Sequence, residues 1–205
     1  MRTRVKICGI THPDDLLAAV ELGADAVGFN FHPPSPRFVD PRIARDLVAL
    51  LPPFVEAVGV FVARPVAESC KVLDGIRTVQ MHAGLGDAAP VEFRLVPAYP
   101  VRSKEDLGKI EQALPTLRPV AVLVDGHAPG LHGGTGQVAP WDLLAEWKPA
   151  VPVILAGGLT PENVAEAVRR VRPYAVDVAS GVESSPGRKC PEKMRRFLDA
   201  VRDRQ

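Results

Sequence analysis

The sequence predicts an α/β fold: a small (β/α)8 TIM barrel with a shortened fourth helix. Eight apolar runs rich in β-branched residues recur along 205 residues, about 25 residues apart, and helical patterns stand between most of them. Strands that alternate with helices form a parallel sheet, and eight such units can close into a barrel. The alternative, an open doubly wound sheet, normally has a G-x-G-x-x-G motif after its first strand, and none is present.

The predicted strands are residues 4–9, 24–31, 55–62, 78–82, 94–99, 120–126, 151–158 and 174–180. The first helix should begin near Pro13, with acidic residues in its first turn, and end at Gly23. Several later helical patterns follow the same plan. Only residues 83–93 separate the fourth and fifth strands, so that helix should have a turn or two. The pattern leaves no room for a linker, and residues 1–205 are expected to form a single domain.

Composition excludes several classes of protein. The net charge is +1 and Lys and Arg form no long block, so neither nucleic acid nor a membrane surface is expected as a partner. No apolar run approaches the roughly 18 residues of a membrane span, and the first residues lack a signal-peptide pattern. Three widely spaced cysteines indicate reduced thiols in the cytoplasm and no metal site. The sequence leaves open whether the protein is a monomer or a homodimer.

Active sites of such barrels lie at the C-terminal ends of the strands, and here several strands end in polar residues. Because side chains alternate along a strand, Lys6 and Cys8 should face the barrel interior, as should His82, Asp125 and Asp177. The first and eighth strands are neighbours in a closed barrel. We therefore expect an ion pair between Lys6 and Asp177, since either charge would be costly to bury alone.

Cys8 lies at the end of the first strand, beside Gly9 and two residues after Lys6. A nearby cation stabilises a thiolate, so Lys6 is expected to lower the pKa of Cys8. Most free cysteines only fill apolar space, but the strand-end position and inward face favour a functional role for Cys8. Cys70 and Cys190 fall in helical patterns and are expected to be structural.

Glycine-rich segments follow the last three predicted strands, at residues 132–137, 156–163 and 179–189. Glycine lets backbone N–H groups approach a ligand, and the last loops of such barrels, with a short extra helix, often bind phosphate. The segment "GVES" could supply that helix. The alternative is a set of tight turns. The phosphate site should include Gly134, Gly157, Gly158, Ser180 and Gly181.

A proline-rich segment, "FHPPSPRFVD" at residues 31–40, follows the second strand and contains Arg37. An arginine can bind a planar carboxylate through two parallel hydrogen bonds. A surface arginine is the ordinary alternative, but the stiff segment makes a substrate anchor equally reasonable.

These stretches together resemble the phosphoribosylanthranilate isomerase family of tryptophan biosynthesis. "KICGIT", "GFNFHPPSPR", "VQMH", "VLVDG", "GGTGQ", "ILAGGLTPENV" and "DVASGVESSPGRK" are similar to that family's blocks, in the family's order, from residue 5 to 189. The sequence departs from the usual blocks at Ala83, Ala179 and Cys190. The resemblance implies a barrel enzyme with no metal and no cofactor that rearranges a phosphosugar substrate.

The resemblance also implies roles for single residues. Cys8 would be the general base, Asp125 the general acid, and Arg37 the anchor of the anthranilate carboxylate. His82 and Asp177 are expected to contact the substrate as well. Other phosphosugar barrels, such as indole-glycerol-phosphate or thiamin-phosphate synthases, would not need Cys8 and Asp125 together. A non-catalytic binding barrel would need neither, and a redox protein would need a second cysteine near Cys8.

Overall fold

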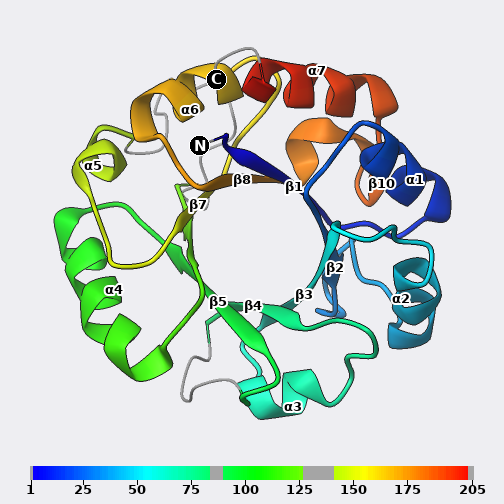
Figure 1. The fold of residues 1–205 in the computed structure, drawn as a ribbon, viewed down its shortest axis with the longest axis horizontal. Coiled ribbons are helices and arrows are strands. Elements are labelled where there is room, and N and C mark those ends of the chain that lie inside the picture. The colour runs from blue at the N-terminus through cyan, green and yellow to red at the C-terminus, as the bar shows by residue number, and fades with distance from the viewer. Residues whose placement is uncertain (1, 84–89, 127–140, 203–205) are drawn as a thin grey trace.

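The structure is a computed structural model that describes residues 2–83, 90–126 and 141–202. Eight parallel strands close into a barrel in chain order, with β8 paired to β1 (Figure 1). The closure confirms the predicted (β/α)8 barrel and excludes the open sheet. The strands are β1 (Arg4–Cys8), β2 (Ala26–Asn30), β3 (Glu56–Val62), β4 (Thr78–His82), β5 (Arg94–Pro100), β6 (Val122–Asp125), β7 (Val153–Ala156) and β8 (Ala175–Val178).

Helices surround the barrel on its outside (Figure 1). They are α1 (Pro13–Glu21), α2 (Pro41–Val48), α3 (Val66–Cys70), α4 (Lys104–Leu117), α5 (Trp141–Glu146), α6 (Val164–Val171) and α7 (Pro191–Arg202). A short helix was expected between β4 and β5. The described residues there, 83 and 90–93, form a bend and turns, and residues 84–89 lie outside the described part. In the described ranges, none of the helices has the length and apolar character that a membrane span needs.

The first helix begins and ends where its sequence predicts. Pro13 opens α1, and the side chain of His12 accepts a hydrogen bond from the backbone N–H of Asp14. Gly23 follows the helix with a φ of +83°, a left-handed conformation that glycine adopts without steric cost. The chain can therefore turn back at Gly23 and enter β2.

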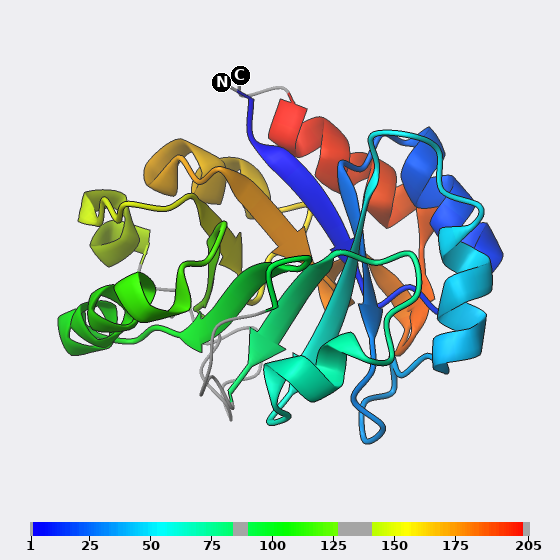
Figure 2. The same ribbon diagram turned by 60° about the horizontal axis from the view of Figure 1, so that its bottom comes forward.

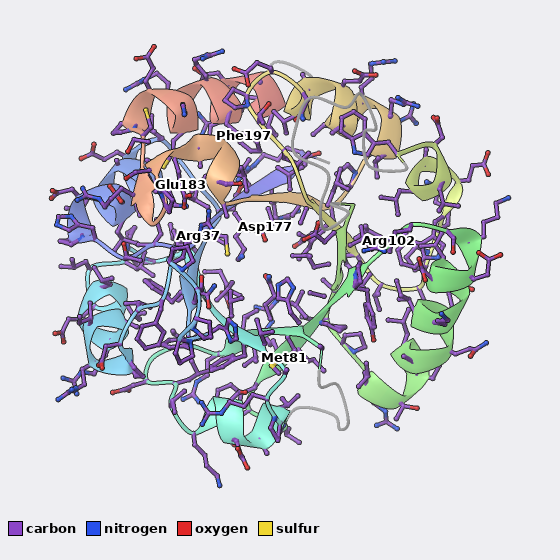
Figure 3. All side chains as sticks on the ribbon, turned by 180° about the vertical axis from the view of Figure 1, so that it is seen from behind. Arg37, Met81, Arg102, Asp177, Glu183 and Phe197 are labelled. Carbon is purple, nitrogen blue, oxygen red and sulfur yellow. The ribbon has the colours of Figure 1, made fainter. Side chains whose placement is uncertain are left out.

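Side chains alternate along the strands between an outer and an inner core. Ile7, Val79, Met81 and Val176 point outward and pack in the large apolar cluster between the barrel and the helices; Met81 is labelled in Figure 3. Apolar residues in the barrel interior form two smaller clusters, one including Val96, Ala98, Ala121, Leu123 and Ala156, the other Cys8, Val58 and Val60. The predicted alternation is therefore confirmed for these strands.

All eight arrows run the same way through the barrel, so the strand ends that contain Cys8, His82 and Asp125 share one end (Figure 2). At this end the chain continues from β8 into a short 3-10 helix, η1 (Ser180–Val182), as expected. Strands β9 (Glu183–Ser185) and β10 (Arg188–Lys189) then form an antiparallel hairpin, which was not expected. The hairpin adds side chains to the polar end of the barrel.

Candidate active site

An ion pair lies inside the barrel, as the alternation predicts. The Nζ atom of Lys6 donates a hydrogen bond to Oδ1 of Asp177 at 2.9 Å, and the side chains are 6% and 8% exposed. The two residues are direct neighbours in the β1–β8 pairing, and Figure 3 shows Asp177 inside the ring of strands. Although burial opposes it, the charges of Asp177 and Cys8 raise the pKa of Lys6 above its usual value. Lys6 is therefore a permanent cation beneath Cys8.

Replacing Lys6 by methionine should lower the free energy of unfolding by about 3–5 kcal/mol, because Asp177 would be left charged and buried without a partner. Urea denaturation followed by circular dichroism measures this change. Lys109→Met is the matched control. Lys109 is 77% exposed and its nearest carboxylate oxygen, on Asp106, is 3.9 Å away, so it forms a weak surface ion pair. The double variant Lys6→Met/Asp177→Asn should recover most of the loss. Equal stability of Lys6→Met and Lys109→Met would contradict the prediction.

Cys8 ends β1 with its thiol in the barrel interior, only 8% exposed. Lys6 lowers the pKa of Cys8, as expected, but the net shift of this pKa is upward. Burial raises the pKa of Cys8, and the opposing charge of Lys6 does not overcome it because Asp177 raises the pKa too. The negative charge of Asp177 largely cancels that of Lys6, so Lys6 stabilises the thiolate of Cys8 less than the sequence alone predicts. The positive charge of Lys189 also lowers the pKa of Cys8, by less than Lys6 does.

Two glycines make room around the thiol. Gly28 is the neighbour of Cys8 on β2, and a Cβ atom there would lie 2.8 Å from the sulfur and 3.0 Å from Nζ of Lys6. Gly9 has a φ of +78°, and a Cβ there would lie 2.6 Å from Cδ of Arg37. The glycine after Cys8 therefore lets the Arg37 side chain pass close to the backbone at this strand end.

His82 ends β4 and is half-buried in the same interior. Its Nε2 lies 2.8 Å from Nε2 of Gln80, which faces inward two residues earlier. When the Gln80 amide nitrogen donates this hydrogen bond, Nε2 of His82 accepts it, and the imidazole is then neutral with its proton on Nδ1. Burial also lowers the pKa of His82; Asp177 and Asp125 act in the opposite direction, and Lys6 acts with burial. The charges of Asp177, Asp125 and Lys6 thus all act on His82.

His82 should remain neutral at pH values where an ordinary histidine is already protonated, below about 6.5. Because folding lowers this pKa, the unfolded chain binds the proton more readily, and stability is lost as the pH falls from about 6.5 towards the pKa of the folded state. NMR titration of the imidazole should give a midpoint below that of a free histidine. His82→Gln should remove this component of the pH dependence. A midpoint at or above about 6.5 would contradict the prediction.

Asp125 ends β6 and is half-buried, paired in register with Pro100 of β5 and Ala156 of β7. The strand order places β8 and β7 between β1 and β6, so Asp125 and Cys8 reach the same end from well-separated parts of the ring. Both residues interact electrostatically with the interior cluster of Lys6, Asp177 and His82. Cys8 interacts with Lys6, and the charge of Asp125 acts on His82.

The expected phosphate loops meet at this end. Gly157 and Gly158 follow β7 with φ values of +90° and +63°. Gly181 lies in η1, and a Cβ there would be only 1.9 Å from the carbonyl oxygen of Leu159, so the two loops pack backbone to backbone. Ser180, the first residue of η1, is exposed. Gly134 lies outside the described residues.

The segment after β2 is held by its own polar side chains. Asn30 accepts a hydrogen bond from the backbone N–H of His32 at 2.8 Å and donates one to Oγ of Ser35. The same Ser35 oxygen accepts a hydrogen bond from the backbone N–H of Arg37 at 3.1 Å. The position of Arg37 is therefore fixed by this segment as well as by Gly9.

Arg37 does not stand free at the rim. Its Nε and Nη2 donate to the two carboxylate oxygens of Glu183 at 2.8 and 2.7 Å, and Figure 3 shows the two side chains together. Glu183 also accepts a hydrogen bond at 2.8 Å from Nζ of Lys189, whose side chain is fully buried. The hydrogen bonds to Glu183 are the main reason that the pKa of Arg37 is raised; burial opposes them, and the charges of Glu183 and Cys8 add to them. Sequence reasoning missed Glu183 and Lys189, although both lie in the glycine-rich segment 179–189.

Comparison with known proteins agrees with this arrangement. The family described as N-(5'phosphoribosyl)anthranilate (PRA) isomerase matches residues 5–200. The chain belongs to this isomerase family. The N-(5'-phosphoribosyl)anthranilate isomerase of Geobacter metallireducens is 49% identical over 202 residues, which cover 95% of this chain and 96% of the relative.

Solved structures of the family share the fold. The phosphoribosylanthranilate isomerase of Thermotoga maritima has a TM-score of 0.84 and 36% identity, covering 98% of this chain and 99% of its own. Another solved isomerase of the family, with a TM-score of 0.79, 33% identity and the same coverage of both chains, is in complex with reduced 1-(o-carboxyphenylamino)-1-deoxyribulose 5-phosphate. The resemblance drawn from the sequence blocks is therefore confirmed.

Proposed function

We propose that the protein is an N-(5'-phosphoribosyl)anthranilate isomerase of tryptophan biosynthesis. It converts N-(5-phosphoribosyl)anthranilate into 1-(2-carboxyphenylamino)-1-deoxyribulose 5-phosphate. The observation that supports this most directly is the inward thiol of Cys8 and the carboxyl group of Asp125 at one end of a barrel whose sequence matches the family along residues 5–200. General acid–base catalysis of an aldose–ketose rearrangement needs one group of each kind.

The reaction is an Amadori rearrangement. Asp125, as general acid, protonates the ring oxygen of the ribose, and the ring opens to leave an iminium ion at C1. The iminium withdraws electrons and acidifies the hydrogen on C2, which Cys8 removes as a thiolate. The resulting enolamine tautomerises to the ketone product. Lys6 and Lys189 assist because each positive charge favours the ionised thiol.

Other residues of this end would position the substrate. Arg37 binds the anthranilate carboxylate through the guanidinium edge that Glu183 leaves free. The phosphate would lie against backbone N–H groups of the loops after β7 and β8, with Gly157, Gly158, Ser180 and Gly181, and against the segment with Gly134. His82 and Asp177, which face the interior, would contact the sugar. No step of this chemistry requires a metal or cofactor.

The test is a fluorescence assay of freshly prepared phosphoribosylanthranilate. Adding the protein should accelerate the loss of substrate fluorescence, with no metal or cofactor supplied and equally in the presence of EDTA. Heat-denatured protein provides the background rate, because the substrate also decays spontaneously. A rate no higher than this background would overturn the proposed function, and an absolute need for a metal would overturn the acid–base mechanism.

We also propose that the protein is a single-domain, cytoplasmic enzyme that forms a homodimer. Phe54, between α2 and β3, is fully exposed with a left-handed φ of +71°, at the barrel end opposite the candidate site. A cavity of about 350 Å³, lined in part by Trp147 and Tyr174, lies at that same end. A contact between two copies at this end would remove the exposed aromatic surface of Phe54 from water. One solved relative, 33% identical, is a set of monomers generated from the dimeric isomerase of Thermotoga maritima.

Sedimentation equilibrium tests the assembly. The wild-type protein should sediment with twice the mass of the chain, and Phe54→Asp should sediment as a monomer at the same concentration. The matched control is Ile43→Asp, since Ile43 is also exposed but lies in the first turn of α2, at the other end of the barrel. A monomeric wild-type protein would refute the homodimer without affecting the proposed activity.

A further inference from the structure

Glu183 is a buried carboxylate at the rim of the barrel that takes no part in the proposed proton transfers. The residue is 7% exposed and begins β9, just after the short helix η1. Its two carboxylate oxygens accept three hydrogen bonds, two from Arg37 and one from Lys189. These bonds outweigh burial and lower the pKa of Glu183, so the group is an anion at neutral pH.

We propose that Glu183 is a positioning residue that fixes the guanidinium of Arg37 for the substrate's carboxylate, and thereby sets the preference for a substrate with an aromatic carboxylate. The inference rests on the proposed function, in which Arg37 binds that carboxylate. It adds a residue outside the acid–base pair that determines which substrate is accepted.

The hydrogen bonds of Arg37 leave one side of its guanidinium available. Glu183 occupies the edge formed by Nε and Nη2, and no hydrogen bond from Nη1 to any residue of the described ranges is found. A guanidinium has a second edge, formed by Nη1 and Nη2, that matches a carboxylate equally well. The bidentate contact with Glu183 holds the planar group in one orientation, so that second edge has a fixed direction.

The Arg37 side chain passes the residue that follows Cys8. The stem of Arg37 passes over Gly9, directly after Cys8, so closely that a Cβ on Gly9 would be 2.6 Å from Cδ of Arg37. The charge of Cys8 also raises the pKa of Arg37, though less than Glu183 does. A ligand whose carboxylate binds Arg37 is therefore held beside the proposed base. Positioning of this kind lowers the entropic cost of reaching the transition state.

Lys189 keeps Glu183 in place from the other side. Its fully buried side chain donates to Glu183 at 2.8 Å and to the carbonyl oxygen of Ala179 at 3.2 Å. The backbone N–H of Lys189 donates to the buried carboxylate of Asp15 at 2.9 Å, which ties β10 to α1. Glu183 is thus held on one side by the fully buried Lys189 and contacts the partly exposed Arg37 on the other, so its influence is expected to fall on Arg37.

The experiment compares two ligands that differ only in the carboxylate. They are the reduced product analogue, 1-(2-carboxyphenylamino)-1-deoxyribulose 5-phosphate with its ketone reduced, and the same compound with an unsubstituted phenyl ring. Calorimetry gives the Kd of each. Wild type should prefer the carboxylate, and Glu183→Gln should lose about 10- to 100-fold of this preference, the range expected for hydrogen bonds to a charged group. The Kd of the phenyl compound should be the same for Glu183→Gln and wild type. A general structural defect would instead weaken the binding of both ligands.

Removing the charge of Glu183 leaves the buried ammonium group of Lys189 without a charged partner, so Glu183→Gln is expected to be less stable. Lys189→Met and Lys189→Met/Glu183→Gln avoid this problem, because neither leaves an unpaired ammonium group in the interior. Lys189→Met should keep the carboxylate preference, since Glu183 still holds Arg37, and the double variant should lose it. Glu166→Gln, which removes a surface contact with Arg170, is the matched control and should behave as wild type.

The outcomes separate this inference from the proposed function. If wild type prefers the carboxylate and Lys189→Met/Glu183→Gln prefers it just as strongly, the positioning role is overturned while the isomerase activity stands. Equal binding of both ligands by wild type overturns the role of Arg37 and the inference together. A wild-type protein that neither turns over phosphoribosylanthranilate nor binds either ligand overturns the proposed function itself.

Discussion

Replacing Cys8 by serine is expected to lower kcat by about 10²- to 10⁴-fold, the range that one proton transfer by a positioned side chain contributes. The substitution keeps the shape of the side chain but replaces a thiol by a hydroxyl group, which does not ionise in the accessible pH range. The hydrogen on C2 would then have no base. Stopped-flow and steady-state fluorescence of phosphoribosylanthranilate consumption measure the loss.

The environment of Cys8 adds a pH dependence to this prediction. Burial raises the pKa of the thiol, and the effects of Lys6 and Lys189 only partly compensate. In the free enzyme the active thiolate is therefore the minor form at neutral pH, and kcat/KM should rise with pH through the alkaline range. Cys8→Ser should lack this rise, because the titrating group is gone.

Cys70→Ser is the matched control for the thiol. Cys70 is buried on α3 in the outer apolar core, away from the barrel interior. Its replacement should affect stability and leave kcat and the pH profile unchanged. Near-normal turnover of Cys8→Ser would refute its assignment as the base, and an unchanged alkaline rise would assign that ionisation to another group.

The parts of the site that could be predicted are those that follow from strand periodicity. Lys6 and Asp177 lie 171 residues apart, yet their contact could be predicted because period two gives each an inward face and closure makes β1 and β8 neighbours. The same reasoning places Cys8, His82 and Asp125 at one end. A strand has a fixed period and a fixed partner, so its side chains can be located without coordinates.

The contacts between loops could not be predicted in this way. Arg37 and Glu183 are 146 residues apart, one in a loop and the other in a short hairpin that the sequence does not predict, and only the packing of these segments brings them together. Gly9 and Gly187 show how close that packing is, since a Cβ on either would collide with the segment 36–37. A glutamate in "SGVES" has no sequence signal that distinguishes an anchor from a surface residue.

The net pKa direction of Cys8 illustrates a second limit. The sequence shows that Lys6 is two residues away, but the effect of a cation depends on what else it contacts. Asp177 neutralises Lys6, and the barrel interior removes the thiol from water. Both are properties of the closed barrel, and together they reverse the shift expected from Lys6 alone.

Replacing Asp125 by asparagine is expected to lower kcat as severely as Cys8→Ser does, by about 10²- to 10⁴-fold, because an amide of the same shape cannot donate the proton that opens the ribose ring. Ring opening precedes the step that Cys8 performs. In Asp125→Asn, ring opening should therefore limit the rate, and kcat should not depend on deuteration at C2. In Cys8→Ser, removal of the C2 hydrogen should limit the rate, and this dependence should remain. Single-turnover kinetics with C2-deuterated substrate distinguishes the two variants.

Binding separates a chemical defect from a misfolded site. The reduced product analogue needs no proton from Asp125, so Asp125→Asn should bind it with a Kd within a few-fold of the wild-type value, and the double variant with Cys8→Ser should do the same. Asp142→Asn is the matched control, because Asp142 is 86% exposed on α5. If Asp125→Asn retained wild-type turnover, the acid would have to be another group at this end of the barrel. His82 would be an unsuitable replacement, because burial lowers the pKa of its imidazole and favours the neutral form, which has no acidic proton to give.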